Sequence, residues 1–128
     1  MAFIIAGLMA SLMAWVFDRY IFSKEGLKGV VFFGPFAEEL FKTGLALIFN
    51  TSIILTHIVF GFAEAVMDYK NTKKSLGAMV SLVSHTILGI ITYGLFILLG
   101  SIYIALLIAA IVHISWNKFV MDIVLQKL

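Results

Sequence analysis

The densest group of ionisable residues is the segment "EELFK", residues 38–42, which places Glu38, Glu39 and Lys42 in an otherwise apolar stretch. One charged side chain at the centre of a bilayer costs about 2.5–3.5 kcal/mol on insertion scales, so such residues usually have a function. Glu38 and Lys42 are four residues apart, which on a helix favours an ion pair. Glu39 points about 100° further round the helix. One carboxylate could therefore pair with Lys42 while the other faces water or a substrate.

Other polar residues lie singly in apolar segments and include Glu64, His85, His113 and Asn117. A carboxylate can act as a general base, and an imidazole or amide N–H can stabilise an oxyanion. His113 and Asn117 are four residues apart and share a helix face. Counting about 1.5 Å per residue from the nearest lysines places these four residues and Glu38 at similar depths in a membrane, about 9–21 Å.

Similar depths predict one shared site, because none of these groups can face acyl chains at low cost. We expect an interior cavity with Lys42 at its edge and with the following groups pointing into it: Glu38 or Glu39, Glu64, His85, His113 and Asn117. We expect Val120 to lie on another face. His57 lies near the opposite end of its segment, and we interpret it as a packing residue away from this layer.

The elements that position these residues are apolar helices. The chain has 128 residues, of which 62% are hydrophobic and 12% charged, against about 25% charged in soluble domains. Segments of about 20 mostly apolar residues can span a membrane, and five qualify: 2–22, 30–49, 52–69, 76–99 and 101–125. We therefore predict one all-α transmembrane domain over residues 1–128, a helix bundle with about five spanning helices. The net charge of +2 gives no indication of nucleic-acid binding.

The basic residues predict an orientation. They flank every second break between segments, as Arg19, Lys24 and Lys28, then Lys70, Lys73 and Lys74, and finally Lys127. An excess of Lys and Arg marks the cytoplasmic side. We therefore expect an integral membrane protein with its N-terminus outside and its C-terminus in the cytoplasm. The first 22 residues lack a basic start and a small-residue cleavage site, so we interpret them as a retained helix.

The pair Gly34-Pro35 leaves two alternatives for the second segment. Proline can kink a helix, or it can occupy the first position of a helix that begins there. In the second case Glu38 and Glu39 would lie near a helix N-terminus, whose dipole favours anions.

Four motifs in order resemble a known family. "EELFK" (38–42) is similar to the EExxK motif of PrsW-type intramembrane proteases, which belong to one superfamily with the CAAX-prenyl endopeptidases and the Abi proteins. "FGFAE" (60–64) resembles the second motif, FxxxE. His85 stands where a histidine of the third core helix is expected, and "HISWN" (113–117) resembles HxxxN. The resemblance covers residues 30–125, the four-helix core.

Two positions distinguish branches of that superfamily. CAAX endopeptidases carry Arg one position after Lys42, and they carry His where this chain has Glu64. These differences favour the PrsW branch. The resemblance implies an endopeptidase in a prokaryotic plasma membrane that hydrolyses a peptide bond of a membrane protein or peptide by glutamate-activated water. It implies Glu38, or else Glu39, as the base, with Lys42 keeping one carboxylate ionised. Further roles are water positioning by Glu64 and His85, and oxyanion stabilisation by His113 and Asn117.

Three alternatives stay open. We expect no cofactor, but two histidines and a glutamate also form several catalytic zinc sites, and here the set would be Glu64, His85 and His113. The HExxH spacing of common zinc proteases does not occur in the sequence. Embedded glutamates and histidines could instead serve a proton- or cation-coupled transporter. The third alternative is a non-catalytic membrane scaffold of the same superfamily.

Overall fold

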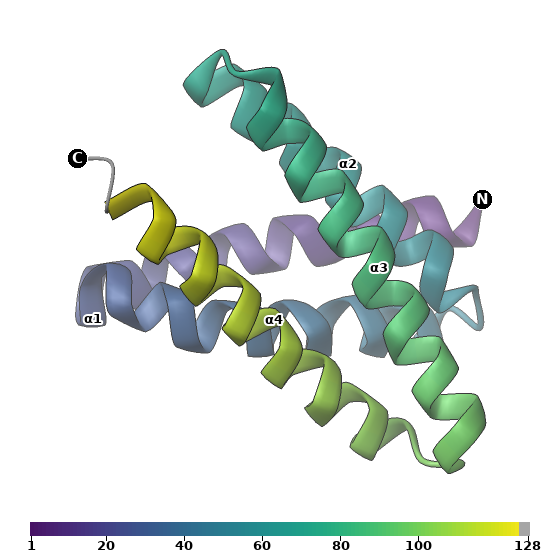
Figure 1. The fold of residues 1–128 in the computed structure, drawn as a ribbon. Coiled ribbons are helices and arrows are strands. Elements are labelled where there is room, and N and C mark those ends of the chain that lie inside the picture. Colours follow the sequence, from purple (N-terminus) through teal and green to yellow (C-terminus); the bar gives the residue numbers. More distant parts are fainter. Residues whose placement is uncertain (126–128) are drawn as a thin grey trace.

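The computed structural model describes residues 1–125, and within them the chain forms four helices (Figure 1). These are α1 (Ala2–Ile48), α2 (Ile53–Thr72), α3 (Ser75–Leu99) and α4 (Ile102–Leu125). The predicted all-α architecture is confirmed, but the predicted number of about five helices was wrong.

The difference in number arises at the first predicted break, residues 23–28. This segment is part of α1 rather than a loop, and Gly26 is its non-helical residue, with φ 65° and ψ −159°. Glycine adopts a positive φ without the steric cost that a Cβ would add. The two halves of α1, purple and blue in Figure 1, lie side by side on either side of this reversal. Phe17 and Phe41 join them edge to face, with ring centroids 6.2 Å apart.

Pro35 lies inside α1 and is buried, so the alternative in which a helix begins at this proline was wrong. Proline has no N–H and therefore cannot donate to the carbonyl of Val31, four residues earlier. Glu38 and Glu39 consequently lie in the interior of a helix, and the dipole of a helix N-terminus does not account for their charges.

Three of the helices within residues 1–125 are long and apolar enough to cross a membrane: α1, α3 and α4 over Ile102–Ile123. α2 does not meet this requirement and contains Glu64, Asp68 and Lys70. Large apolar side chains face outward over much of the surface; Leu98, for example, is 78% exposed. Such a surface is typical of contact with lipid rather than water.

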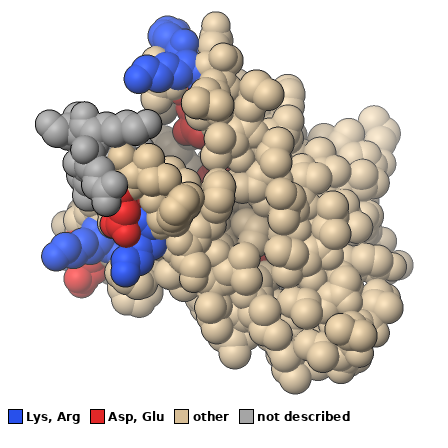
Figure 2. Space-filling model, in the orientation of Figure 1, with Lys and Arg blue, Asp and Glu red and all other residues tan. Residues whose placement is uncertain are grey.

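The ends of the helices lie on two sides of the bundle. In Figure 1 the turn between the two halves of α1 lies at the left and the α2–α3 loop at the top, whereas the α1–α2 junction lies at the right and the α3–α4 junction at the lower right. In the same view, Figure 2 shows Lys and Arg side chains at the left and top, and an uncharged surface over most of the rest. The predicted orientation with respect to the cytoplasm stays a prediction, and Lys127 lies outside the described residues.

Two glycines allow α2 and α3 to approach closely. A Cβ added at Gly61 of α2 would lie 2.8 Å from the Cβ of His85, and one added at Gly89 of α3 would lie 2.7 Å from the Cβ of His57. Each glycine therefore leaves room for a histidine of the facing helix. This reciprocal packing places the two imidazole rings in the interior, where they are 0% (His57) and 3% (His85) exposed.

Candidate functional site

Glu39 and Lys42 form the buried centre of the site. Both are 0% exposed, and Nζ of Lys42 lies 2.6 Å from Oε1 of Glu39, one turn earlier in α1. The distance from Nζ of Lys42 to Oε2 of Glu38 is 3.8 Å. The expectation that Lys42 lies at the edge of a cavity was wrong. Because the ammonium pairs with Glu39 and faces the interior, Lys42 lies in the middle of the polar cluster.

Two histidines from other helices complete the environment of Glu39. Nε2 of His57, from α2, lies 3.0 Å from Oε2, and Nδ1 of His113, from α4, lies 3.0 Å from Oε1. The expectation that His57 lies away from the polar layer was wrong. The helices cross obliquely (Figure 1), so depth counted along each axis does not decide which residues meet.

A signal for His57 was present in the sequence. His57, Phe60, Gly61 and Glu64 follow the spacing i, i+3, i+4 and i+7, which is one face of a helix. The structure buries His57, Phe60 and Gly61, and directs Glu64 toward His85 of α3. Because His57 shares this helix face with Glu64, the spacing alone indicates that His57 belongs to the site.

His85 of α3 connects two charged groups. Its Nδ1 lies 3.1 Å from Nζ of Lys42, and its Nε2 is hydrogen-bonded to Oε2 of Glu64. An ammonium only donates, so Nδ1 accepts and Nε2 carries the proton that is donated to Glu64. Phe60 holds this arrangement in place, since its ring packs edge to face on His85 at 4.9 Å and lies 4.5 Å from Nζ of Lys42.

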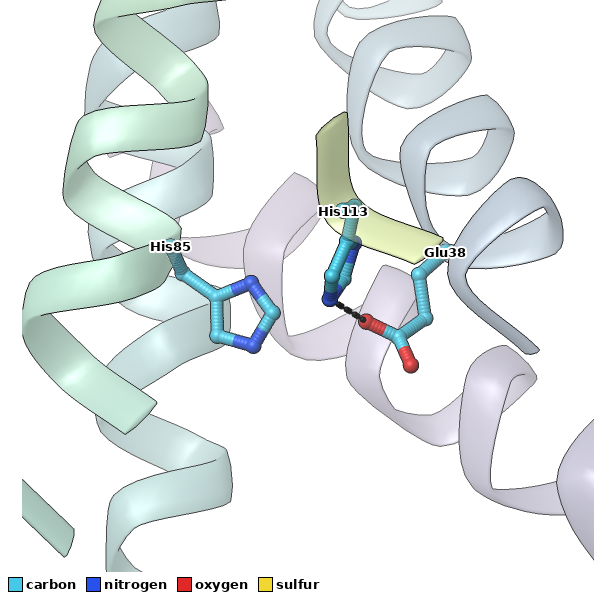
Figure 3. Close-up of side chains that lie close together, drawn as sticks. All are labelled: Glu38, His85 and His113. Atoms are coloured by element: carbon cyan, nitrogen blue, oxygen red, sulfur yellow. Dashed lines mark ion pairs between the residues drawn. The ribbon is translucent and has the colours of Figure 1, made fainter. Parts of the chain in front are cut away.

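Glu38 differs from Glu39 in its partners. It is 5% exposed, yet its Oε2 has no hydrogen-bond partner among the described residues. The nearest cationic or titratable nitrogens are Nζ of Lys42 and Nε2 of His113, each 3.8 Å away. Figure 3 shows Glu38, His85 and His113 converging from α1, α3 and α4, with the Glu38–His113 pair dashed. A buried carboxylate oxygen without a donor has capacity to accept a proton from another molecule.

Four of these residues, Glu38, Glu64, His85 and His113, line one cavity of about 250 Å³. Its polar lining comprises Glu38, Glu64, Asp68, Ser81, Ser84, His85, His113, Trp116 and Asn117. The predicted convergence of Glu38, Glu64, His85, His113 and Asn117 on one cavity is therefore confirmed. Val120 also lines it, so its expected place on another face was wrong.

The hydrogen bond of His113 determines which of its ring nitrogens is free. Nδ1 faces Oε1 of Glu39, and Oε1 also accepts from Lys42, so Nδ1 is the donor. In the neutral ring Nε2 then carries a lone pair. This lone pair and Oε2 of Glu38 are two acceptors 3.8 Å apart, and both residues line the same cavity. A water molecule that moved between them, to the nearly inaccessible Oε2, could donate one hydrogen to each.

The same residues offer a set of ligands for a divalent ion. Atoms of Glu38, His85 and His113 lie within 4.8 Å of one another, a set in which Glu38 replaces the Glu64 of the sequence-based alternative. The arrangement fits a metal poorly, because both nitrogens of His85 have partners, one of which is the Lys42 ammonium. A second cation beside that ammonium would be repelled.

Comparison of the chain with protein-family models, curated proteins and solved structures finds no match. The motifs at residues 38–42, 60–64 and 113–117, together with His85, thus remain the basis of the family resemblance.

Proposed function

We propose that the protein is an intramembrane endopeptidase of the PrsW type that hydrolyses a peptide bond of a membrane protein or peptide. The observation that carries this proposal is the pair of acceptors formed by Oε2 of Glu38 and Nε2 of His113, which are 3.8 Å apart and belong to two residues that line a polar cavity. Such a pair suits a nucleophilic water, because a general base must lie within hydrogen-bond reach of the proton that it removes.

In the proposed reaction, the water oxygen attacks the carbonyl carbon of the scissile bond while Glu38 takes one water proton. The amide N–H of Asn117, on the same cavity wall, donates to the resulting oxyanion. Glu38 then returns its proton to the amide nitrogen as the C–N bond breaks. This scheme moves His113 from oxyanion stabilisation to water positioning, since its Nδ1 already donates to Glu39.

The other polar residues hold these groups in place. Glu39 accepts from Lys42 and His113, which fixes the imidazole that positions the water. Lys42, 3.8 Å from Glu38, favours the ionised form of the base. His85 and Glu64 extend this support to α3 and α2. Preorganised groups of this kind need little rearrangement during the reaction.

Two neighbouring cavities support access for a membrane substrate and for water. An apolar groove of about 360 Å³ along α3 and α4 shares Val80, Ser84 and Trp116 with the polar cavity. It offers a membrane segment a path to the reacting groups. A third cavity, of about 500 Å³, shares Glu64 and Asp68 with the polar cavity. Its lining includes Asp18, Arg19 and Asn71, and it offers a path for water.

Incubation of purified protein with candidate membrane peptides, followed by mass spectrometry, tests the proposal. Wild type should release two fragments whose summed mass exceeds that of the peptide by one water molecule. Glu38→Gln should lower the rate of hydrolysis about 10²–10⁴-fold, the usual contribution of a general base. Glu25→Gln is the matched control, because Glu25 is exposed near the turn at Gly26. Equal rates for Glu38→Gln and wild type would refute the assignment of the base.

A transporter is the second candidate function. The chain from Glu64 through His85, Lys42 and Glu39 to His57 is a continuous series of hydrogen-bonded titratable groups, as used in proton-coupled transport. Acid-driven uptake into liposomes, with no cleavage of any tested peptide, would favour this candidate over hydrolysis.

A further inference from the structure

His57 is a buried titratable residue that the proposed hydrolysis does not use. It belongs to none of the four motifs, yet it is 0% exposed and bonded to Glu39, which is also 0% exposed. Gly89 of α3 packs against its Cβ and fixes the position of the ring. The side chain is thus built into the centre of the bundle, and its hydrogen bonds determine where protons lie.

Both ring nitrogens of His57 face oxygen acceptors. Nδ1 lies 2.9 Å from the carbonyl oxygen of Ile53, which can only accept, so Nδ1 carries a hydrogen. Nε2 lies 3.0 Å from Oε2 of Glu39. A hydrogen bond there requires a second proton, either on Nε2, which makes an imidazolium, or on Oε2, which makes a carboxylic acid. In both forms the pair holds one proton more than a neutral histidine and an ionised glutamate.

The charges of the surrounding cluster give this proton a role. Glu38, Glu39 and Glu64 are three carboxylates around one ammonium, Lys42. His85 and His113, as neutral rings, contribute no charge. With all three carboxylates ionised, a further proton on the His57–Glu39 pair changes the net charge of the cluster from −2 to −1. Uncompensated buried charge is strongly unfavourable, so the proton favours the assembled cluster.

We propose that His57 is a positioning residue that shares one proton with Glu39 and thereby fixes the carboxylate that holds Lys42 and His113. The shared proton follows from the hydrogen-bond geometry alone. The effect on hydrolysis rests in addition on the proposed function.

The proton is tested on purified protein in detergent, without any substrate. ¹⁵N labelling of the three histidines reports which ring nitrogens carry hydrogen, and His57→Gln assigns the His57 signals by their loss. Infrared spectra of wild type and Glu39→Gln report whether the Glu39 carboxyl is protonated. We expect either a doubly protonated His57 with ionised Glu39, or a singly protonated His57 with protonated Glu39. Any other number of protons on the pair would overturn the proposal.

The positioning role is tested by comparing His57→Gln with His57→Leu. The Gln amide can still donate to Glu39, whereas Leu leaves Oε2 without a donor. We expect His57→Leu to lower kcat about 10–100-fold at nearly unchanged KM, the usual effect of losing an orienting partner, and His57→Gln to recover most of it. Wild-type kcat in His57→Leu would overturn the role. Inactive wild type would refute the hydrolase instead, while the spectroscopic result still decides the shared proton.

Discussion

Substitutions at the two adjacent glutamates should affect different properties: loss of the Glu39 charge should lower stability, and loss of the Glu38 charge should lower activity. Oε1 of Glu39 accepts from Lys42 and His113, and Oε2 is hydrogen-bonded to His57, all at 2.6–3.0 Å, whereas Glu38 has no hydrogen-bond partner on Oε2 among the described residues. Substitution of each glutamate by glutamine keeps the shape and removes the charge. The same chemical change should therefore have different consequences at neighbouring positions.

The magnitudes follow from these contacts. Glu39→Gln presents an amide NH₂ to groups that are themselves donors, so one or two hydrogen bonds to a charged group are lost, each worth about 1.5–3 kcal/mol. Removing one partner of a buried ion pair costs about 3–5 kcal/mol, which agrees. In Glu38→Gln the lost attraction to Lys42 at 3.8 Å is offset by no longer burying a charge. We expect that variant to change stability by less than about 1 kcal/mol.

Unfolding of the protein in mixed micelles by increasing sodium dodecyl sulfate, followed by circular dichroism, measures both changes. Glu25→Gln, on an exposed residue of α1, provides the baseline. The reasoning is refuted if Glu38→Gln destabilises the protein as much as Glu39→Gln does, or if Glu39→Gln unfolds like the baseline variant. Activity should depend strongly on Glu38 even though stability does not. Glu38→Gln should therefore be folded but should hydrolyse substrate about 10²–10⁴-fold more slowly than wild type.

Further expectations concern topology, metal dependence, packing and the oxyanion. Labelling of intact cells should find residue 1 accessible from outside and Lys73 only from inside, and an externally reactive Lys73 would invert the topology. Dialysis against a strong chelator should leave hydrolysis unchanged, and loss that zinc restores would make Glu38, His85 and His113 ligands. Gly89→Ala should lower the unfolding midpoint because its Cβ would meet His57, whereas Gly94→Ala, with open space around it, should match or exceed wild type. Asn117→Ala should lower kcat about 10²–10³-fold, and an unchanged kcat would remove Asn117 from the oxyanion.

Much of the fold could be predicted because apolar helices leave clear boundaries in a sequence. The predicted segments 52–69, 76–99 and 101–125 correspond to α2, α3 and α4 to within three residues at each end. The first predicted break, residues 23–28, does contain the reversal at Gly26, but the sequence did not predict that α1 continues through it. Its polar residues remain helical, and the reversal occurs at the positive φ of Gly26, a backbone property that composition does not reveal.

The cavity could be predicted in outline for a related reason. Polar groups in apolar helices must face the interior, so their convergence follows from energetics rather than from detailed geometry. The position of Lys42 could not be predicted this way, because a lysine can either extend toward an interface or pair with a buried carboxylate. The second outcome requires Glu39, His85 and Phe60 to surround its ammonium, and they come from three helices.

The choice between Glu38 and Glu39 as the free carboxylate shows most clearly what the sequence leaves open. Both can reach Lys42 along one helix, at spacings of four and three residues, so local geometry favours neither strongly. The decision comes from α2 and α4. His57 of α2 and His113 of α4 are both hydrogen-bonded to Glu39, whereas no donor among the described residues reaches Oε2 of Glu38. Under the proposed function, Glu39 therefore organises the site, and Glu38 keeps the accepting capacity that a base requires.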